Sequence, residues 1–145
     1  MEDIALGLTH FGTMPRRQMR AGISPNTILL DRSAIEAFGK KHDAATYRHW
    51  RREGLAQADF AFNFEKAFDE ATANASSIQF NLDGMNVPRA WRQGQHHYLA
   101  PSGGYTAWEF RQVLTRPGLL AKTIFWQNGK QVLLSRVLER AGVVP

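Results

Sequence analysis

Residues Phe68–Phe110 read FDEATANASSIQFNLDGMNVPRAWRQGQHHYLAPSGGYTAWEF, and this stretch decides the fold. It contains, in order, the end of a helix, a short apolar strand at Ser77–Leu82, a basic aromatic segment, and a glycine pair that opens a second helix. Helix and strand signals that are interleaved along one chain predict an α/β or α+β domain.

The strongest helix signal lies just upstream of that strand, at Leu55–Ala75. Apolar residues recur there at intervals of three and four, which places them on one face of a helix. They are Phe60, Phe64, Ala67, Phe68 and Ala71. Such a face is typical of a helix that packs on a core. Phe62 falls outside the stripe, and we therefore single it out as the aromatic residue to examine as a ligand contact.

Downstream, the pattern changes from helix to strands. Thr106–Leu114 is expected to be a helix that Pro117 terminates. Two strands follow, at Lys122–Gln127 and Gln131–Ser135, and Asn128-Gly129 between them has the composition of a hairpin turn.

Three other segments lack clear periodicity. Met85–Ser102 is rich in Pro and Gly and is expected to be a long functional or mobile loop. Residues 1–24 are expected to be a loosely structured lead-in. The tail Arg136–Pro145 is expected to form one helical turn and then fray.

The length and composition indicate one domain. A chain of 145 residues, of which 43% are hydrophobic, can bury one core and is too short for two. The expected arrangement is a helical N-terminal half packed on a small, mostly parallel C-terminal sheet.

Charge and cysteine content limit the function. The net charge of +5 favours an anionic partner. The absence of cysteine excludes disulfides, thiolate nucleophiles and zinc sites built on Cys. No apolar run approaches the ~20 residues of a transmembrane helix, and the N-terminus lacks a signal-peptide pattern.

Three pieces of the chain, in this order, resemble the ADP-ribosyl cyclase family. They are Phe68-Asp69-Glu70-Ala71, then Ile78-Gln79-Phe80-Asn81-Leu82-Asp83-Gly84, then Thr106-Ala107-Trp108-Glu109 after a glycine turn. A fainter match covers Ile28–Ile35. The C-terminal run FNLDG, YTAWE and KTIFW-x-NGK also resembles toxin domains of bacterial contact-dependent inhibition and RHS-type proteins, some of which are thought to be cyclase-like.

The resemblance implies a cyclase-like fold and an enzyme that hydrolyses NAD⁺ or NADP⁺ as its substrate, without a cofactor or metal. It implies Glu109 as the catalytic carboxylate, with Thr106 beside it. The substrate-binding residues that it implies are Arg32, Ser33, Gly103, Gly104, Tyr105, Trp91, Trp108 and Phe62.

The chain departs from the family pattern at several of these positions. Asp31 stands where the family has a tryptophan, and the arginine is shifted by one place to Arg32. The hydroxyl-rich phosphate turn has become Gly103-Gly104-Tyr105.

One carboxylate suits this chemistry. The nicotinamide leaving group of NAD⁺ is already cationic, so that cleavage needs stabilisation of a ribosyl cation rather than a general acid. A helix N-terminus would help to keep Glu109 ionised. Backbone amides at Gly103 and Gly104 could approach the pyrophosphate, and Arg32, Arg89 or Arg92 could neutralise it.

Each of these assignments has a structural alternative. Thr106 and Glu109 have the spacing of a capping box, in which threonine is the N-cap and glutamate its partner. Trp108 suits a core position, and Arg32 suits a solvated or ion-paired one.

A metal-independent ribonuclease is the alternative function, with RNA as the partner. His96 and His97 could transfer protons while Arg92 or Lys122 binds the phosphate. Adjacent side chains on an extended segment point to opposite sides, so a distant histidine would be needed. Tyr47–Arg52 is the one candidate for a nucleic-acid recognition helix.

The resemblance to toxins also implies a biological setting. The domain would be secreted as part of a larger effector and would act in the cytoplasm of a target bacterium. A cognate immunity protein would protect the producer, and the charge of +5 predicts that its surface is acidic.

Overall fold

The computed structural model describes residues 4–7, 28–29, 37–38, 41, 52 and 56–145. Within these residues a five-stranded sheet has the order β2-β1-β3-β4-β5. The strands are β1 (Ile4–Gly7), β2 (Ile28–Leu29), β3 (Ile78–Asn81), β4 (Thr123–Gln127) and β5 (Lys130–Val132). The first four strands are parallel, and β5 pairs antiparallel with β4. The sheet is therefore mixed and mostly parallel.

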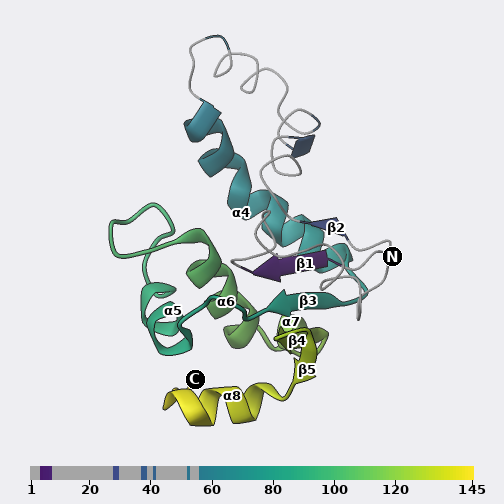
Figure 1. Ribbon diagram of the computed structural model, residues 1–145. Helices are drawn as coiled ribbons and strands as arrows, with labels where there is room; N and C mark the ends of the chain where they lie inside the picture. Colours follow the sequence, from purple (N-terminus) through teal and green to yellow (C-terminus); the bar gives the residue numbers. More distant parts are fainter. Residues whose placement is uncertain (1–3, 8–27, 30–36, 39–40, 42–51, 53–55) are drawn as a thin grey trace.

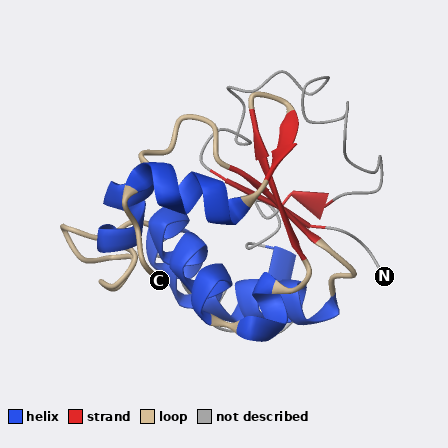
Figure 2. Ribbon diagram, turned by 90° about the horizontal axis from the view of Figure 1, so that it is seen from below, coloured by secondary structure: helices blue, strands red, loops and turns tan. Residues whose placement is uncertain are grey.

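Helices pack beside this sheet, and their interleaving with the strands along the chain fits an α/β domain. They are α4 (Ala56–Asn74), α5 (Val87–Gln93), α6 (Tyr105–Thr115), α7 (Pro117–Leu120) and α8 (Leu134–Ala141). Figure 2 shows the described helices gathered on one side of the strands. None of the helices in the described part of the chain is both long and apolar enough to cross a membrane.

The connection from β3 to β4 sets the direction of α6. β3 and β4 are parallel neighbours, so the chain between them must return to the starting edge of the sheet, and α5, α6 and α7 make this return. α6 consequently begins near the carboxyl ends of the strands. The arrowheads of β1 and β3 point towards it (Figure 1).

The strand order reverses between β1 and β3. β2 lies on one side of β1, whereas β3 and then β4 lie on the other. In open parallel sheets the crevice at the carboxyl ends of two such strands is the usual ligand site.

Aromatic rings on α4, α6 and the sheet form the core. Phe80 of β3 packs on Phe110 of α6, with ring centroids 5.6 Å apart, and Phe68 of α4 packs edge-on against Trp108 at 5.1 Å. Phe64 and Ala67 are buried as well, and Ala71 packs partly against the core. The helical stripe predicted for these residues is therefore confirmed; the side chains of Phe60 and Phe62 lie outside the described part.

The β4–β5 hairpin follows its turn sequence. Asn128 and Gly129 have φ angles of 54° and 75°, the left-handed pair that a two-residue hairpin turn requires. The partner strand ends at Val132 rather than at Ser135, because α8 begins at Leu134 and buries Val137 and Leu138. The prediction for the tail is wrong in the same way, since α8 extends to Ala141.

Three further predictions are wrong. Ile4–Gly7 is not part of a loose lead-in but a strand between β2 and β3. The N-terminal half thus supplies two strands, and α5–α8 belong to the C-terminal half, so that the expected split into N-terminal helices and a C-terminal sheet fails. Met85–Ser102 is not one loop, because it contains α5. Asn86 caps that helix by accepting a hydrogen bond of 3.1 Å from the backbone of Arg89.

Candidate active site around Glu109

Glu109 is a buried acid on α6. The residue is 2% exposed, and among the residues that the structure describes its Oε2 atom has no hydrogen-bond partner. A buried carboxyl oxygen without a partner is costly and requires a reason, which is often functional.

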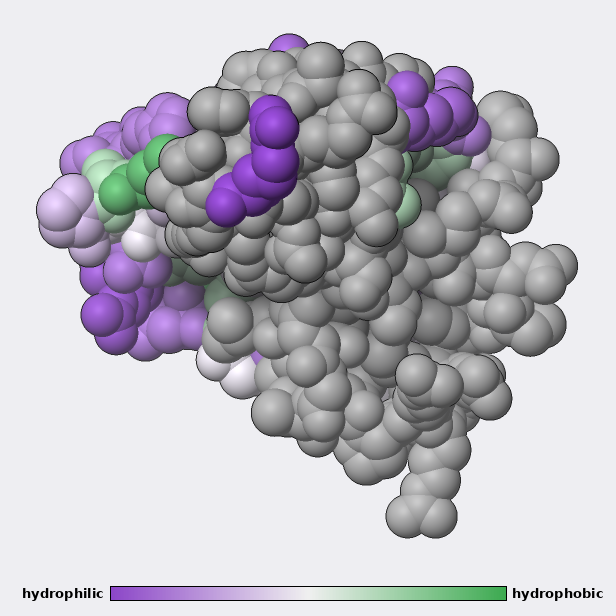
Figure 3. Space-filling model, turned by 90° about the horizontal axis from the view of Figure 1, so that it is seen from above, coloured by the Kyte–Doolittle hydropathy of each residue, from purple (hydrophilic) through white to green (hydrophobic). Residues whose placement is uncertain are grey.

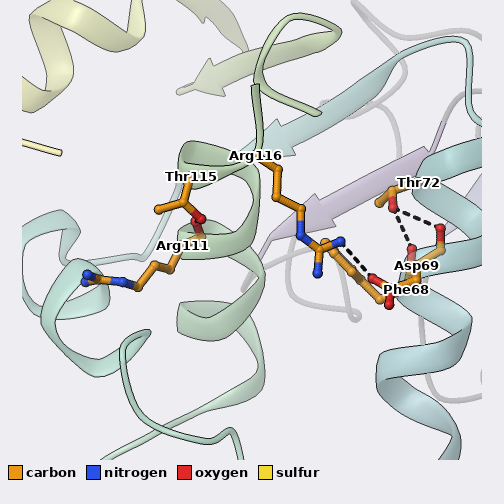
Figure 4. Close-up of polar contacts among 6 residues, drawn as sticks. All are labelled: Phe68, Asp69, Thr72, Arg111, Thr115 and Arg116. Atoms are coloured by element: carbon orange, nitrogen blue, oxygen red, sulfur yellow. Dashed lines mark hydrogen bonds and ion pairs between the residues drawn. The ribbon is translucent and has the colours of Figure 1, made fainter. Parts of the chain in front are cut away.

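The rotation of α6 shows which side Glu109 faces. Arg111 points to α5 and Arg116 points to α4, on opposite sides of the helix (Figure 4). Glu109 precedes Arg116 by seven residues, which is about two turns, so the two share a side. Trp108, the residue before Glu109, packs on Phe68 of α4, and α6 also contacts β1, so we infer that Glu109 lies on the side of α6 that is turned towards α4 and β1.

Burial controls the ionisation of this acid. Removal from water raises the pKa of Glu109 well above its ordinary value. Burial thus acts against the ionisation that the helix N-terminus was expected to favour.

The start of α6 decides between a capping role and other roles for Glu109. The N-cap is Gly104, whose carbonyl accepts a hydrogen bond of 3.0 Å from the backbone of Trp108, and no side chain caps the helix. Thr106 is thus the second helical residue and Glu109 the fifth, so the capping box is wrong. Thr106 is half-buried and lies one turn from Glu109 on a similar side of α6.

An aromatic cluster holds the beginning of α6 against α4. Its members are Phe64, Phe68, Tyr98, Tyr105 and Trp108. Trp108 is 8% exposed and contacts Phe64, Phe68 and Tyr98, so it occupies the core position that the sequence left open. Tyr105 stacks on Tyr98 with ring centroids 5.2 Å apart. The pKa of Tyr98 is raised, chiefly by burial and then by the charges of Glu65 and Tyr105.

The two glycines before α6 differ in their surroundings. A Cβ on Gly103 would collide with the carbonyl oxygen of His97, so this position requires glycine for close packing. No atom of the described residues lies within 4 Å of the place where a Cβ on Gly104 would stand. Gly104 therefore leaves the first turn of α6 approachable.

Trp91 does not join this group. The guanidinium of Arg111 lies 4.0 Å from the Trp91 ring centroid and donates a hydrogen bond of 2.8 Å to the Trp91 carbonyl. Arg111 is two residues from Glu109 and hence about 200° away around the helix. Arg32 and Ser33 lie outside the described residues, as does the side chain of Phe62 on α4.

The histidine pair lies on the exposed turns between α5 and α6. His96 and His97 are both exposed, and Nδ1 of His97 accepts a hydrogen bond of 3.1 Å from the backbone of Leu99. On this side of the molecule, at the left of Figure 3, the coloured residues are mostly hydrophilic. Lys122 donates a hydrogen bond of 2.9 Å to the carbonyl of Ala75, the residue that follows α4. Within the described residues no three His, Asp or Glu side chains form a metal-binding group.

Two features of this region were missed at the sequence level. No local sequence motif marks the end of β1 beside β3. The apolar run Ile4–Leu6 is the sole sequence signal for this strand. Tyr98 lies in the segment predicted to be a loop, yet it packs on His97 and Tyr105, and the aromatic-rich sequence around it is the signal for this packing.

Comparison with known proteins adds no relative. A scan against protein-family models, a search of curated proteins and a search of solved structures each find no match. The geometry around Glu109 and the sequence motifs are therefore the basis for a functional proposal.

Proposed function

We propose that this chain is an ADP-ribosyl cyclase-like toxin domain that hydrolyses the nicotinamide–ribose bond of NAD⁺ or NADP⁺. The observation that carries the proposal is the buried carboxyl of Glu109, whose Oε2 atom has no hydrogen-bond partner within the described part of the chain. It lies on a helix that begins near the carboxyl ends of parallel strands, beside the point where the strand order reverses.

The reaction needs what such an acid can supply. Breaking the bond releases neutral nicotinamide and leaves positive charge on the ribosyl carbon, and water then adds there to give ADP-ribose and a proton. A carboxylate close to that carbon stabilises the developing charge. The interaction is strong in a buried position because the local dielectric is low.

The raised pKa of Glu109 fits a cationic substrate. In the free protein, burial favours the neutral acid. A pyridinium ring and an emerging ribosyl cation are opposite charges that shift this equilibrium back to the carboxylate. Substrate binding and ionisation of Glu109 therefore support each other.

Other residues take supporting roles in the proposal. Thr106, one turn from Glu109, offers a hydroxyl to the ribose. The open side of Gly104 lets the pyrophosphate approach the first amides of α6. Tyr105 is half-buried at the same end of the helix and offers a ring face. Arg32 and Ser33 bind phosphate in this proposal through the sequence resemblance alone.

The toxin assignment rests on the sequence resemblance and on charge. A domain that destroys NAD⁺ harms any cytoplasm that holds it, so a producer requires an immunity protein. The net charge of +5 predicts an acidic surface on that protein. Export within a larger effector and action in the cytoplasm of a target bacterium complete the proposal.

The test is to identify products from the purified chain. Incubation with NAD⁺ and, separately, NADP⁺ should release nicotinamide and the matching ADP-ribose, which chromatography resolves. Parallel incubation with tRNA and rRNA should leave both intact. Intact dinucleotides together with cleaved RNA would replace this function with the ribonuclease, and His96 and His97 would become the residues to change.

A further inference from the structure

The basic residues of the C-terminal half divide into two groups. Residues 76–145 contain Arg89, Arg92, Arg111, Arg116, Lys122, Lys130, Arg136 and Arg140. Arg111, Arg116 and Lys122 are half-buried, and each binds a partner within the fold. The other five are exposed, and among the described residues their side chains have no ion-pair or hydrogen-bond partner.

The five unpaired cations come from three elements that belong together. Arg89 and Arg92 are on α5, Lys130 is on β5, and Arg136 and Arg140 are on α8. α5 packs against α8, and β5 leads directly into α8 (Figure 1). One exposed carboxylate, Glu139, lies on these elements. We call this region the α5–α8 basic surface.

An exposed leucine accompanies the arginines. Leu133 is 65% exposed and precedes Arg136 by three residues and Arg140 by seven, so all three lie along one side of α8. The adjoining side of the helix buries Val137 and Leu138.

We propose that the α5–α8 basic surface binds an acidic protein. Arginine forms paired hydrogen bonds with carboxylates, and arginine is enriched at protein interfaces. A nucleic-acid surface would combine its cations with exposed aromatic rings. Here the exposed apolar side chain is Leu133, and Trp91 of α5 is covered by Arg111. A protein is therefore the better fit.

This surface is separate from Glu109. α5 lies on the Arg111 side of α6, whereas Glu109 faces α4 and β1. The inference goes beyond NAD⁺ cleavage and does not depend on it.

The test uses a fluorescein-labelled peptide of glutamate and leucine, with an oligouridylate of equal charge as the competing probe. Anisotropy at low ionic strength should show that the peptide binds more tightly. The double variant Arg136→Glu/Arg140→Glu should bind it at least about tenfold more weakly, as should Arg89→Glu/Arg92→Glu. Leu133→Ser should weaken the binding of the glutamate–leucine peptide but not the binding of pure polyglutamate.

The matched control is Lys41→Glu/Arg52→Glu, which changes the net charge equally at two exposed positions outside the surface. Three results would overturn the proposal. The control variant could lose as much affinity for the peptide as the surface variants do. Oligouridylate could bind more tightly through the same arginines, or wild type could bind no peptide. Arg136→Gln/Arg140→Gln serves as a milder variant if the reversal unfolds the protein. NAD⁺ hydrolysis by the Arg136→Glu/Arg140→Glu variant should equal that of wild type, which separates this test from that of the proposed function.

Discussion

The carboxylate of Asp83 accepts a hydrogen bond of 2.7 Å from the backbone N–H of Asn128. It thereby joins the turn after β3 to the β4–β5 hairpin. Asp83 is half-buried, and its own backbone N–H donates to the side chain of Asn81 at 3.1 Å. The motifs FNLDG and QNGK, which are separate in sequence, thus form one unit.

Replacing Asp83 should loosen this unit. Asp83→Ala removes the acceptor and should lower the free energy of unfolding by about 1 kcal/mol. This value is below that of a fully buried charge-assisted hydrogen bond because Asp83 is partly exposed. Asp83→Asn keeps an acceptor and should lose less. Urea denaturation measures both. An alanine variant as stable as wild type would mean that the bond to Asn128 contributes nothing.

The left-handed backbone of Asn128 gives a second prediction. Its φ of 54° is tolerated by asparagine and glycine but strained for other residues. Asn128→Ala should cost about 1 kcal/mol of stability, whereas Asn128→Gly should be nearly neutral. Thermal unfolding compares the two variants. An alanine variant as stable as the glycine variant would contradict the assigned turn.

Gly94 controls the approach of α5 to α6. A Cβ there would collide with the carbonyl of Ala107 and would lie 2.8 Å from the Cβ of Arg111. Gly94→Ala should therefore destabilise the protein by about 2 kcal/mol. Gly118→Ala is the matched control, because a Cβ on Gly118 meets nothing within 4 Å. The denaturant midpoint of Gly94→Ala should be lower than that of Gly118→Ala. Similar midpoints would refute the close contact between Gly94 and α6.

Glu109 should make stability fall with rising pH. Burial raises its pKa above the ordinary value of 4.5, so the folded state binds the proton more tightly than the unfolded state does. The stabilising contribution is complete below that ordinary value and is lost as pH rises through the folded pKa.

Glu109→Gln is neutral at every pH and isolates this effect. The melting temperature of the variant minus that of wild type should increase as pH rises from below 4.5 towards neutrality. Scanning calorimetry across that range measures the difference. A difference that stays constant with pH would show that Glu109 is not desolvated.

The elements predicted correctly from sequence have strong local signals. The apolar stripe through Phe64 and Phe68 predicts α4, and Asn128-Gly129 predicts the hairpin, because helix periodicity and turn chemistry depend on near neighbours. The wrong predictions depend on distant partners. Ile4–Gly7 has four residues and no period, and its identity as a strand comes from pairing with β2 and β3.

The same distinction applies to the candidate site. Sequence motifs select Glu109, but its burial depends on how α6 packs against α4 and β1, which no local pattern encodes. The capping box failed because Gly104 starts α6 before Thr106 can cap it. The Asn86 cap of α5 was available in the sequence, since asparagine followed by Val87-Pro88 is a typical helix start.

The most direct test of the central claim is the rate of nicotinamide release from NAD⁺ by wild type and Glu109→Gln at neutral pH. We expect wild type to release nicotinamide, and the variant, shown to be folded by circular dichroism, to be slower by about 100-fold or more, as expected when charge stabilisation is removed. Equal rates in the two proteins would show that Glu109 is not the catalytic carboxylate. Absence of release by wild type would contradict the NAD⁺ hydrolase itself.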